Sequence, residues 1–178
     1  HLADFLLSQG IEVYGLTHPS HHSKTLDKRV KVTNCDLLKK NQLSQYLKSK
    51  IIDFIFHLAA FSSPPQSFIN PKKTLENNIL SQLNLLEVLK DQKSKSKILI
   101  ISSSDIYGDV DEKYIPVDES APFLPNSPYA VSKVAQDMLG LQFYLHDKLN
   151  IIRVRPFNHI GPGQSKSFVV PSFAAQIA

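Results

Sequence analysis

Cysteine is almost missing from this chain of 178 residues, which holds only Cys35. A single thiol cannot close an internal disulfide, and it cannot build a cysteine-based metal site. The seven histidines show no spacing with carboxylates that indicates a metal either, so we expect no metal. So little cysteine suits a reducing compartment, and we expect a cytoplasmic location.

Long hydrophobic runs are missing as well. No apolar stretch reaches the roughly 18 residues that a membrane span requires, so we expect no membrane association. The formal net charge is +4, but the basic residues are mostly lysines scattered singly or in pairs. Nucleic-acid binding would favour an arginine-rich stripe with interleaved aromatic residues, so we expect no nucleic-acid partner.

A glycine-rich phosphate turn of the form Gly-x-x-Gly-x-x-Gly is absent, and the chain does not begin with methionine. Residues 2–6 have helical apolar spacing, and Gly10 is a fitting helix stop. The strand predicted over 11–16 therefore has no strand before it. We interpret the chain as a fragment that lacks a first strand with its glycine-rich turn, so a missing targeting signal carries little information.

Strands and helices alternate along the rest of the chain. The predicted strands lie over 11–16, 29–32, 51–60, 98–101 and 150–155, and predicted helices include 43–47, 75–86 and 127–145. This alternation predicts an α/β fold, a doubly wound parallel sheet (Rossmann-like) with helices on both faces. The first strand is central in that order, so its absence predicts an empty slot between 11–16 and 51–60.

Burial is predicted from the apolar pattern. The strand over 51–60 is almost wholly apolar, which is the signature of burial on both sheet faces. The helix over 127–145 has Ser127 as a good N-cap and Pro128 at its first position. In the helix over 75–86, one face is lined by Leu75, Ile79, Leu83 and Leu86. In the helix over 127–145, the predicted core face consists of Val131, Val134, Ala135, Met138, Leu141 and Leu145.

Tyr129 and Lys133 are four residues apart, so they share one face of this helix. Alone, the pair is also explained by a half-buried tyrosine and a solvated lysine. Ser103, after the strand over 98–101, completes a possible proton-transfer site. An ammonium about 5 Å from a phenol favours the phenolate by roughly 3 kcal/mol at an effective dielectric near 20, so we expect the pKa of Tyr129 to fall by about two units.

Two further positions suit a nucleotide. Asp36 follows a predicted strand, where its carboxylate could accept a hydrogen bond from an adenine amino group, although a loop-starting aspartate explains it equally well. Leu58, Ala59 and Ala60 close the strand over 51–60 at its carboxyl end, where ligands bind in open α/β sheets. Small residues there allow close approach of a dinucleotide, while core packing is the alternative.

Five segments together resemble the extended short-chain dehydrogenase/reductase family that acts on nucleotide sugars. They are His57 to Ala60, Asn78 to Glu87, Ser102 to Gly108, Ser127 to Lys133 and Arg155 to Gln164. The last segment, with Ser167 to Ala174, is most similar to the family's GDP-4-dehydro-6-deoxy-D-mannose reductases, which make GDP-D-rhamnose. The missing glycine-rich turn departs from the family pattern.

The resemblance implies NADP as cofactor, with NAD possible, and a nucleotide-sugar ketone as substrate. Tyr129 would donate a proton, Lys133 would hold the tyrosine and the cofactor ribose, and Ser103 would donate a hydrogen bond to the substrate C4 oxygen. The other implied cofactor contacts are Asp36, Leu37, Leu58, Ala59, Ala60, Asn78, Pro156 and Phe157. The other implied substrate contacts are Ser104 and Asn158.

The resemblance also implies an organisation for the chain. An NAD(P)-binding domain would occupy residues 1–165, and a substrate-binding subdomain would begin over 166–178. Relatives often form homodimers through two helices per subunit, which here correspond to 71–89 and 129–145.

Fold alone does not select the reaction. The family's 4,6-dehydratases have an acid/base residue, typically glutamate, where this chain has the shorter Asp105. That difference favours a reductase and leaves a 4,6-dehydratase or 4-epimerase as the alternative.

The end of the second strand bears on the choice of cofactor. An aspartate there would repel the 2′-phosphate of NADPH, but this chain has Thr17. The nearby basic residues His18, His21, His22 and Lys24 also permit NADPH.

An alternative of another class is a non-catalytic, dinucleotide-binding sensor or structural protein. The intact trio of Ser103, Tyr129 and Lys133 argues against it.

Overall fold

The computed structural model describes residues 1–20 and 26–177. The strands are β1 (Tyr14–Thr17), β2 (Lys31–Asn34), β3 (Phe54–His57), β4 (Lys97–Ile101) and β5 (Asn150–Val154). The α-helices are α1 (Leu2–Ser8), α2 (Lys40–Lys48), α3 (Pro64–Ile69), α4 (Pro71–Leu75), α5 (Ser81–Asp91), α6 (Pro128–Leu145) and α7 (Val169–Ile177). A π-helical turn, η1 (Glu76–Leu80), joins α4 to α5, and η2 (Ser104–Tyr107) and η3 (Glu112–Tyr114) are 3-10 turns. Across the described ranges, no helix is long and apolar enough to span a bilayer.

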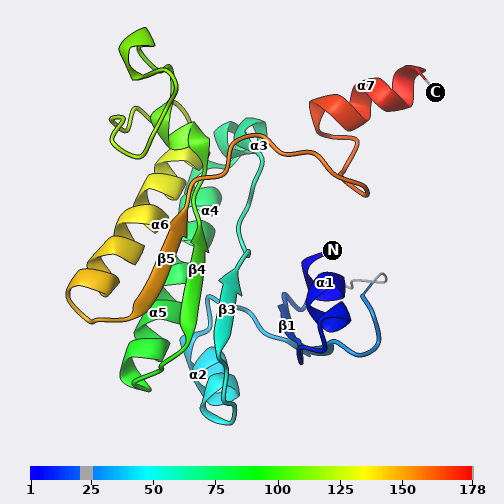
Figure 1. Cartoon of the computed structure of the whole chain (residues 1–178), viewed down its shortest axis with the longest axis vertical. Helices are drawn as coiled ribbons and strands as arrows, with labels where there is room; N and C mark the ends of the chain where they lie inside the picture. Colours follow the sequence, from blue (N-terminus) through cyan, green and yellow to red (C-terminus); the bar gives the residue numbers. More distant parts are fainter. Residues whose placement is uncertain (21–25, 178) are drawn as a thin grey trace.

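The strands form two parallel sheets (Figure 1). β1 pairs with β2, and β4 lies between β3 and β5. The prediction of an α/β fold with parallel strands is confirmed. No backbone pairing joins β1 to β3 in the described part of the chain, so the two sheets separate where the empty slot was predicted.

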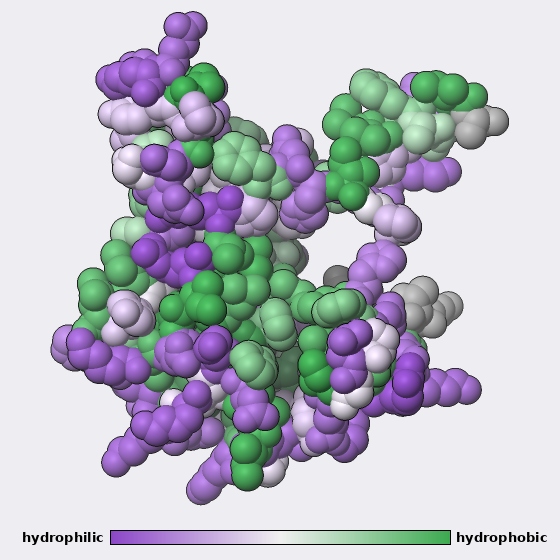
Figure 2. Space-filling view, in the orientation of Figure 1, coloured by the Kyte–Doolittle hydropathy of each residue, from purple (hydrophilic) through white to green (hydrophobic). Residues whose placement is uncertain are grey.

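Among the described residues, helices cover one face of the sheet β3-β4-β5 and leave the other uncovered. Ile98 and Ile100 of β4 point into the core with α5 and α6, and both are fully buried. The opposite face is apolar but open (Figure 2), with Phe54 60% and Ile152 45% exposed. The prediction that residues 51–60 are buried on both faces is therefore wrong, because β4 is the only described neighbour of β3 and no described helix covers this face.

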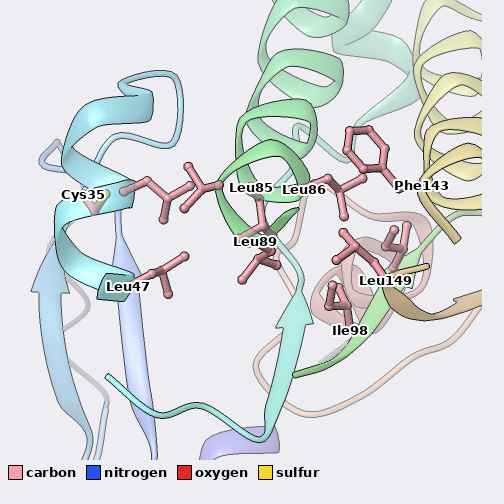
Figure 3. Close-up of a cluster of buried hydrophobic side chains, with 11 residues drawn as sticks. Cys35, Leu47, Leu85, Leu86, Leu89, Ile98, Phe143 and Leu149 are labelled. Atoms are coloured by element: carbon pink, nitrogen blue, oxygen red, sulfur yellow. The ribbon is translucent and has the colours of Figure 1, made fainter. Parts of the chain in front are cut away.

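The main hydrophobic core joins the two sheets through α2 (Figure 3). Leu43 and Leu47 of α2 belong to the same buried cluster as Leu86 of α5 and Ile98 of β4. Burying such a side chain fully contributes about 1.5–3 kcal/mol. The core therefore holds the β1-β2 sheet beside β3-β4-β5, although no backbone hydrogen bond between the described residues connects the two sheets.

The predicted helix over 75–86 contains a register change. The π turn η1 places an extra residue in the helix, which rotates the side chains that follow it. As a result Leu83 is only partly buried, and α5 buries Leu85, Leu86 and Leu89 instead. Of the two α5 members of the predicted stripe, Leu86 is fully buried and Leu83 is partly buried and packs against the core cluster.

The helix α6 begins as predicted, but it buries a different face. Ser127 accepts a hydrogen bond from the backbone N–H of Ala130, and Pro128 is the first helical residue. The predicted core residues Val131 and Leu145 are 44% and 56% exposed, so that part of the prediction is wrong. The face that is buried consists of Tyr129, Ala130, Ser132, Lys133, Gln136, Asp137, Gly140 and Phe143. Most of these are polar, so apolar periodicity could not locate them.

Gly140 permits the close approach of α6 to the sheet. A Cβ at this position would lie 2.8 Å from Cδ1 of Ile100 and 3.2 Å from Cδ of Arg153. We predict that Gly140→Ala lowers the free energy of unfolding by about 1–3 kcal/mol through overpacking, despite the better helix propensity of alanine. Urea unfolding followed by circular dichroism measures this. Gln142→Ala on the exposed face is the control, and a Gly140→Ala variant as stable as the control would contradict the packing.

Candidate active site

Tyr129, Lys133 and Asp137 follow one another at intervals of four residues along the buried face of α6. Their exposed fractions are 8%, 5% and 0%. Buried polar and charged groups are costly unless they have partners. Each of these three side chains has its partner on a different neighbouring segment. This buried polar stripe of Tyr129, Lys133 and Asp137 therefore determines which segments α6 packs against.

Lys133 lies above the carboxyl end of β4. Its Nζ donates a hydrogen bond to the carbonyl oxygen of Ile101 at 2.9 Å, and it lies 5.8 Å from the centroid of the Tyr129 ring. Burial penalises the ammonium and lowers the pKa of Lys133 to about 8. The predicted neighbourhood of tyrosine and lysine is thus present in the structure.

The pKa of Tyr129 moves in the direction opposite to the prediction. Burial raises this pKa above its ordinary value of 10.0, the charge of Asp105 raises it further, and the nearby Ser103 side chain opposes both. The expected drop of two units was wrong because it counted the ammonium and omitted desolvation of the phenolate. The phenol is therefore held in its protonated form in the free protein.

Ser103 stands where β4 passes into the turn η2. Its Oγ accepts a hydrogen bond from the backbone N–H of Asp105 at 3.2 Å, which fixes the hydroxyl at the start of the turn. A pocket of about 210 Å³ opens beside it, lined by Ser104, Asp105, Tyr107, Gly108, Val110, Asn126 and Phe157. A small polar ligand group could enter this pocket beside Ser104 and Asp105, the residues that directly follow the serine.

The end of β5 supplies the opposite wall of this pocket. The backbone N–H of Ser104 donates to the carbonyl oxygen of Pro156 at 3.0 Å, so residues 156–158 run beside η2. Phe157 is 57% exposed and lines the pocket, and Asn158 is exposed just beyond it. Three of the predicted contacts, Ser104, Pro156 and Phe157, thus gather around Ser103.

Asp137 was not predicted from the sequence. Its carboxylate is fully buried and forms ion pairs with Arg153 and Arg155 of the β5 segment. Arg155 also donates to the hydroxyl of Tyr107 at 2.9 Å, and this environment raises the pKa of the guanidinium. One fork of hydrogen bonds therefore joins α6, β5 and η2. The signal available in the sequence was the spacing of Asp137, four residues after Lys133.

His57 ends β3 and is 6% exposed. Burial and the charge of Lys133 lower its pKa to about 4, so the imidazole is neutral near pH 7. Within the described residues its Nε2 atom has no hydrogen-bond partner. The imidazole thus adds no second positive charge beside Lys133.

The predicted nucleotide contacts lie at the carboxyl ends of β2 and β3. Leu58 and Ala59 are exposed beyond β3, and Ala60 is half-buried. The Asp36 carboxylate accepts a hydrogen bond from the backbone N–H of Leu38 at 3.0 Å, which is the loop role considered as its alternative. The carbonyl oxygen of Leu37 accepts from the Asn84 side chain.

Asn78 is fully buried and binds main chain. Its side chain contacts both the N–H and the C=O of Phe61, at 2.7 and 3.0 Å. The structure therefore uses its amide to hold the segment that follows Ala60.

The structure describes only some of the residues near Thr17 that were considered for contact with a 2′-phosphate. The Thr17 hydroxyl donates to Oδ1 of Asn34 at 3.0 Å, where β1 and β2 end together. Of the basic residues considered for a 2′-phosphate, His21, His22 and Lys24 lie outside the described ranges.

Comparison with known proteins agrees with this geometry. A family model described as GDP-mannose 4,6 dehydratase matches residues 1–178. The GDP-6-deoxy-D-mannose reductase of Pseudomonas aeruginosa is 43% identical over 143 residues, which are 80% of this chain and 47% of the reductase. The solved structure of RMD from the same organism, complexed with NADPH, has a TM-score of 0.76 and 38% identity, over 89% of this chain and 54% of that chain.

A second solved structure is the UDP-N-acetylglucosamine 4-epimerase of Methanobrevibacter ruminantium. It has a TM-score of 0.88 and 31% identity, and covers 99% of this chain and 58% of its own. This chain thus spans about half the length of these relatives.

Parallel strands whose carboxyl ends carry a serine beside a tyrosine and a lysine define a Rossmann-like protein of the short-chain dehydrogenase/reductase class. Within that class, the chain belongs to the GDP-mannose 4,6-dehydratase family.

The burial of Lys133 predicts a pH dependence of stability. A lysine with a pKa of about 8 when folded and 10.5 when unfolded disfavours folding while it is protonated. Stability of the full-length protein should therefore rise with pH through this window, by on the order of 2 kcal/mol between about pH 7 and pH 10 relative to Lys133→Met. Urea unfolding of both proteins measures the difference. Lys39→Met, at an exposed position, is the control, and a pH-independent difference for Lys133→Met would contradict the burial.

Proposed function

We propose that this chain carries the proton-transfer site of an NADPH-dependent reductase of nucleotide-activated 4-keto-6-deoxy sugars, with NADH as a possible substitute. The proposed reaction converts GDP-4-dehydro-6-deoxy-D-mannose to GDP-D-rhamnose. One observation carries the proposal: the Tyr129 phenol is close enough to the Ser103 side chain for the serine to lower its pKa, and the Tyr129 ring lies 5.8 Å from Nζ of Lys133. The 43% identity to a GDP-6-deoxy-D-mannose reductase supports this choice of substrate.

The residues present fit a dinucleotide cofactor. Lys133 makes one hydrogen bond in the described structure, to Ile101, although an ammonium has three donors. The remaining donors suit the hydroxyls of a ribose. Leu58 and Ala59 offer exposed backbone at the carboxyl end of β3, where cofactors bind in such sheets. Asp36 and Leu37 would contact the adenine, and Pro156 and Phe157 would approach the nicotinamide.

The chain's own residues would supply the proton. When bound, a reduced nicotinamide would supply the hydride that reduces the C4 carbonyl of the sugar. Tyr129 then gives its phenolic proton to the C4 oxygen, and its raised pKa keeps that proton in place until a ketone is reduced. Ser103 donates a hydrogen bond to the same oxygen, and Ser104 and Asn158 would contact the sugar nucleotide. General acid catalysis of this kind typically contributes about 100- to 10,000-fold.

Dehydration is the second candidate, and one observation favours it. The Asp105 carboxylate lines the pocket and is close enough to Tyr129 to raise the pKa of its phenol. A carboxylate in this place could remove a proton from the sugar, as a 4,6-dehydratase requires. A 4-epimerase is the further alternative within the family.

Assembly, location and domain limits also belong to the proposal. The half-exposed apolar residues of α6, including Val131 and Leu145, suit pairing of two copies through the helices over 71–89 and 129–145. We also propose a cytoplasmic location, an NAD(P)-binding domain over 1–165 and a substrate subdomain that begins over 166–178. In Figure 1 the helix α7 of that last segment lies apart from the sheets.

Turnover tests the proposed reaction. The full-length protein is incubated with GDP-4-dehydro-6-deoxy-D-mannose and NADPH, and oxidation of the cofactor is followed by absorbance. Tyr129→Phe removes only the proton donor, so we predict at least about a 100-fold loss of kcat with cofactor affinity kept within a few-fold. Tyr144→Phe, at an exposed position of the same helix, is the matched control. Equal turnover by Tyr129→Phe and wild type would refute the assignment and favour the non-catalytic class.

Asp105→Asn separates the reductase from the dehydratase. A reductase does not need this carboxylate, so we predict less than about a tenfold change in kcat for reduction. Release of a 4-keto-6-deoxy product from GDP-mannose by the wild type, lost in Asp105→Asn, would instead identify a dehydratase.

A further inference from the structure

Tyr129 occupies the second position of α6, within the first helical turn. Backbone N–H groups in this turn have no partner inside the helix, and helix ends fray unless they are capped. A proton donor placed there needs a support from outside the helix. The catalytic site described above does not provide it.

Ser67 supplies the support on the N–H side. The backbone N–H of Tyr129 donates to the Ser67 hydroxyl at 3.1 Å, and that hydroxyl donates in turn to the carbonyl oxygen of Pro64 at 2.6 Å. Ser67 belongs to α3 and is fully buried. The first turn of α6 is therefore capped twice, once by its own Ser127 and once by a serine 62 residues away.

Ser132 and Asn78 supply the support on the carbonyl side. The Ser132 hydroxyl donates to the carbonyl oxygen of Tyr129 at 2.6 Å and accepts from the Asn78 amide at 2.9 Å. The same amide side chain bonds both backbone groups of Phe61. Ser132 and Asn78 are fully buried, so water does not compete for these bonds.

We propose that Ser67, Ser132 and Asn78 form a positioning frame for Tyr129, and the proposal rests on the function proposed above. The frame holds both backbone polar groups of Tyr129, so it sets how far the phenol reaches toward Ser103. It also ties the tyrosine to Phe61, directly after the Leu58–Ala60 segment. Binding at that segment and the position of the proton donor are thereby coupled.

The frame differs from a hydrogen-bond network that only stabilises the fold, because it holds the backbone of the proposed proton donor, Tyr129. A displacement of about 1 Å at a reacting group can cost roughly 100-fold in rate. Loss of the Ser67 acceptor frees the backbone of Tyr129 while Ser127 still caps the helix. The phenol should then move away from the Ser103 side chain, whose interaction with it lowers the pKa of Tyr129 in the intact site.

Ser67→Ala in the full-length protein is the test. We expect kcat to fall about 10- to 100-fold while KM for the sugar nucleotide changes less than about threefold. The pKa of Tyr129 should rise, measured without substrate by ultraviolet difference titration against Tyr129→Phe.

Ser63→Ala is the matched control. It removes the N-cap hydroxyl of the same helix α3, which accepts from the backbone N–H of Gln66 and does not contact Tyr129. This variant should keep the wild-type kcat and titration. Ser67→Cys keeps nearly the same volume with a weaker acceptor, so its changes should run in the same direction and be smaller; it replaces Ser67→Ala should that variant fail to fold.

The outcomes separate the two proposals. Wild-type protein without turnover would count against the proposed reaction, and the titration would still test the frame. A Tyr129 titration in Ser67→Ala that matches wild type, or moves to lower pH, would overturn the frame. Equal losses of kcat in Ser67→Ala and Ser63→Ala would overturn it as well, because a general loss of folded protein explains that result.

Discussion

Burial of the polar face of α6 is the constraint on which the rest of this structure depends. A helix that places a phenol, an ammonium and a carboxylate in its interior requires a partner for each of them. Tyr129 meets Ser103, Lys133 meets the carbonyl of Ile101, and Asp137 meets Arg155. These partners come from the ends of β4 and β5, so satisfying the stripe also assembles the pocket between them.

This arrangement has a cost that the remainder of the fold offsets. The pKa values of Lys133 and His57 are lowered by burial, so folding works against their charged forms. The apolar side of α6 faces outward instead, with Val131 and Leu145 exposed. Stability comes from the cluster around Leu86 and Ile98, which lies on the same face of the sheet but away from the pocket. The chemistry and the core thus occupy different parts of one helix layer.

Much of this could be predicted from the sequence, and the failures share a cause. The strand and helix alternation, the Ser127-Pro128 helix start and the Ser103, Tyr129 and Lys133 grouping depend on local patterns, and the structure has all three. The buried face of α6 and the one-sided burial of β3 depend on which elements become neighbours. Apolar periodicity assumes that buried residues are apolar, so it assigns the wrong face to a helix whose interior is polar. The same assumption could not reveal Asp137 in the buried stripe, nor Ser67, Ser132 and Asn78 as members of the positioning frame.

The most direct measurement is the ionisation of Tyr129 itself, followed by NMR of ring-labelled tyrosine in the free protein. The account predicts that Tyr129, like the partly buried Tyr46, titrates above its ordinary pKa, that Tyr129→Phe removes one of these two signals, and that Ser103→Ala raises the pKa of Tyr129 further because the opposing influence of the serine is lost. A Tyr129 that titrates like an exposed tyrosine and does not respond to Ser103→Ala would contradict a phenol held inside the site.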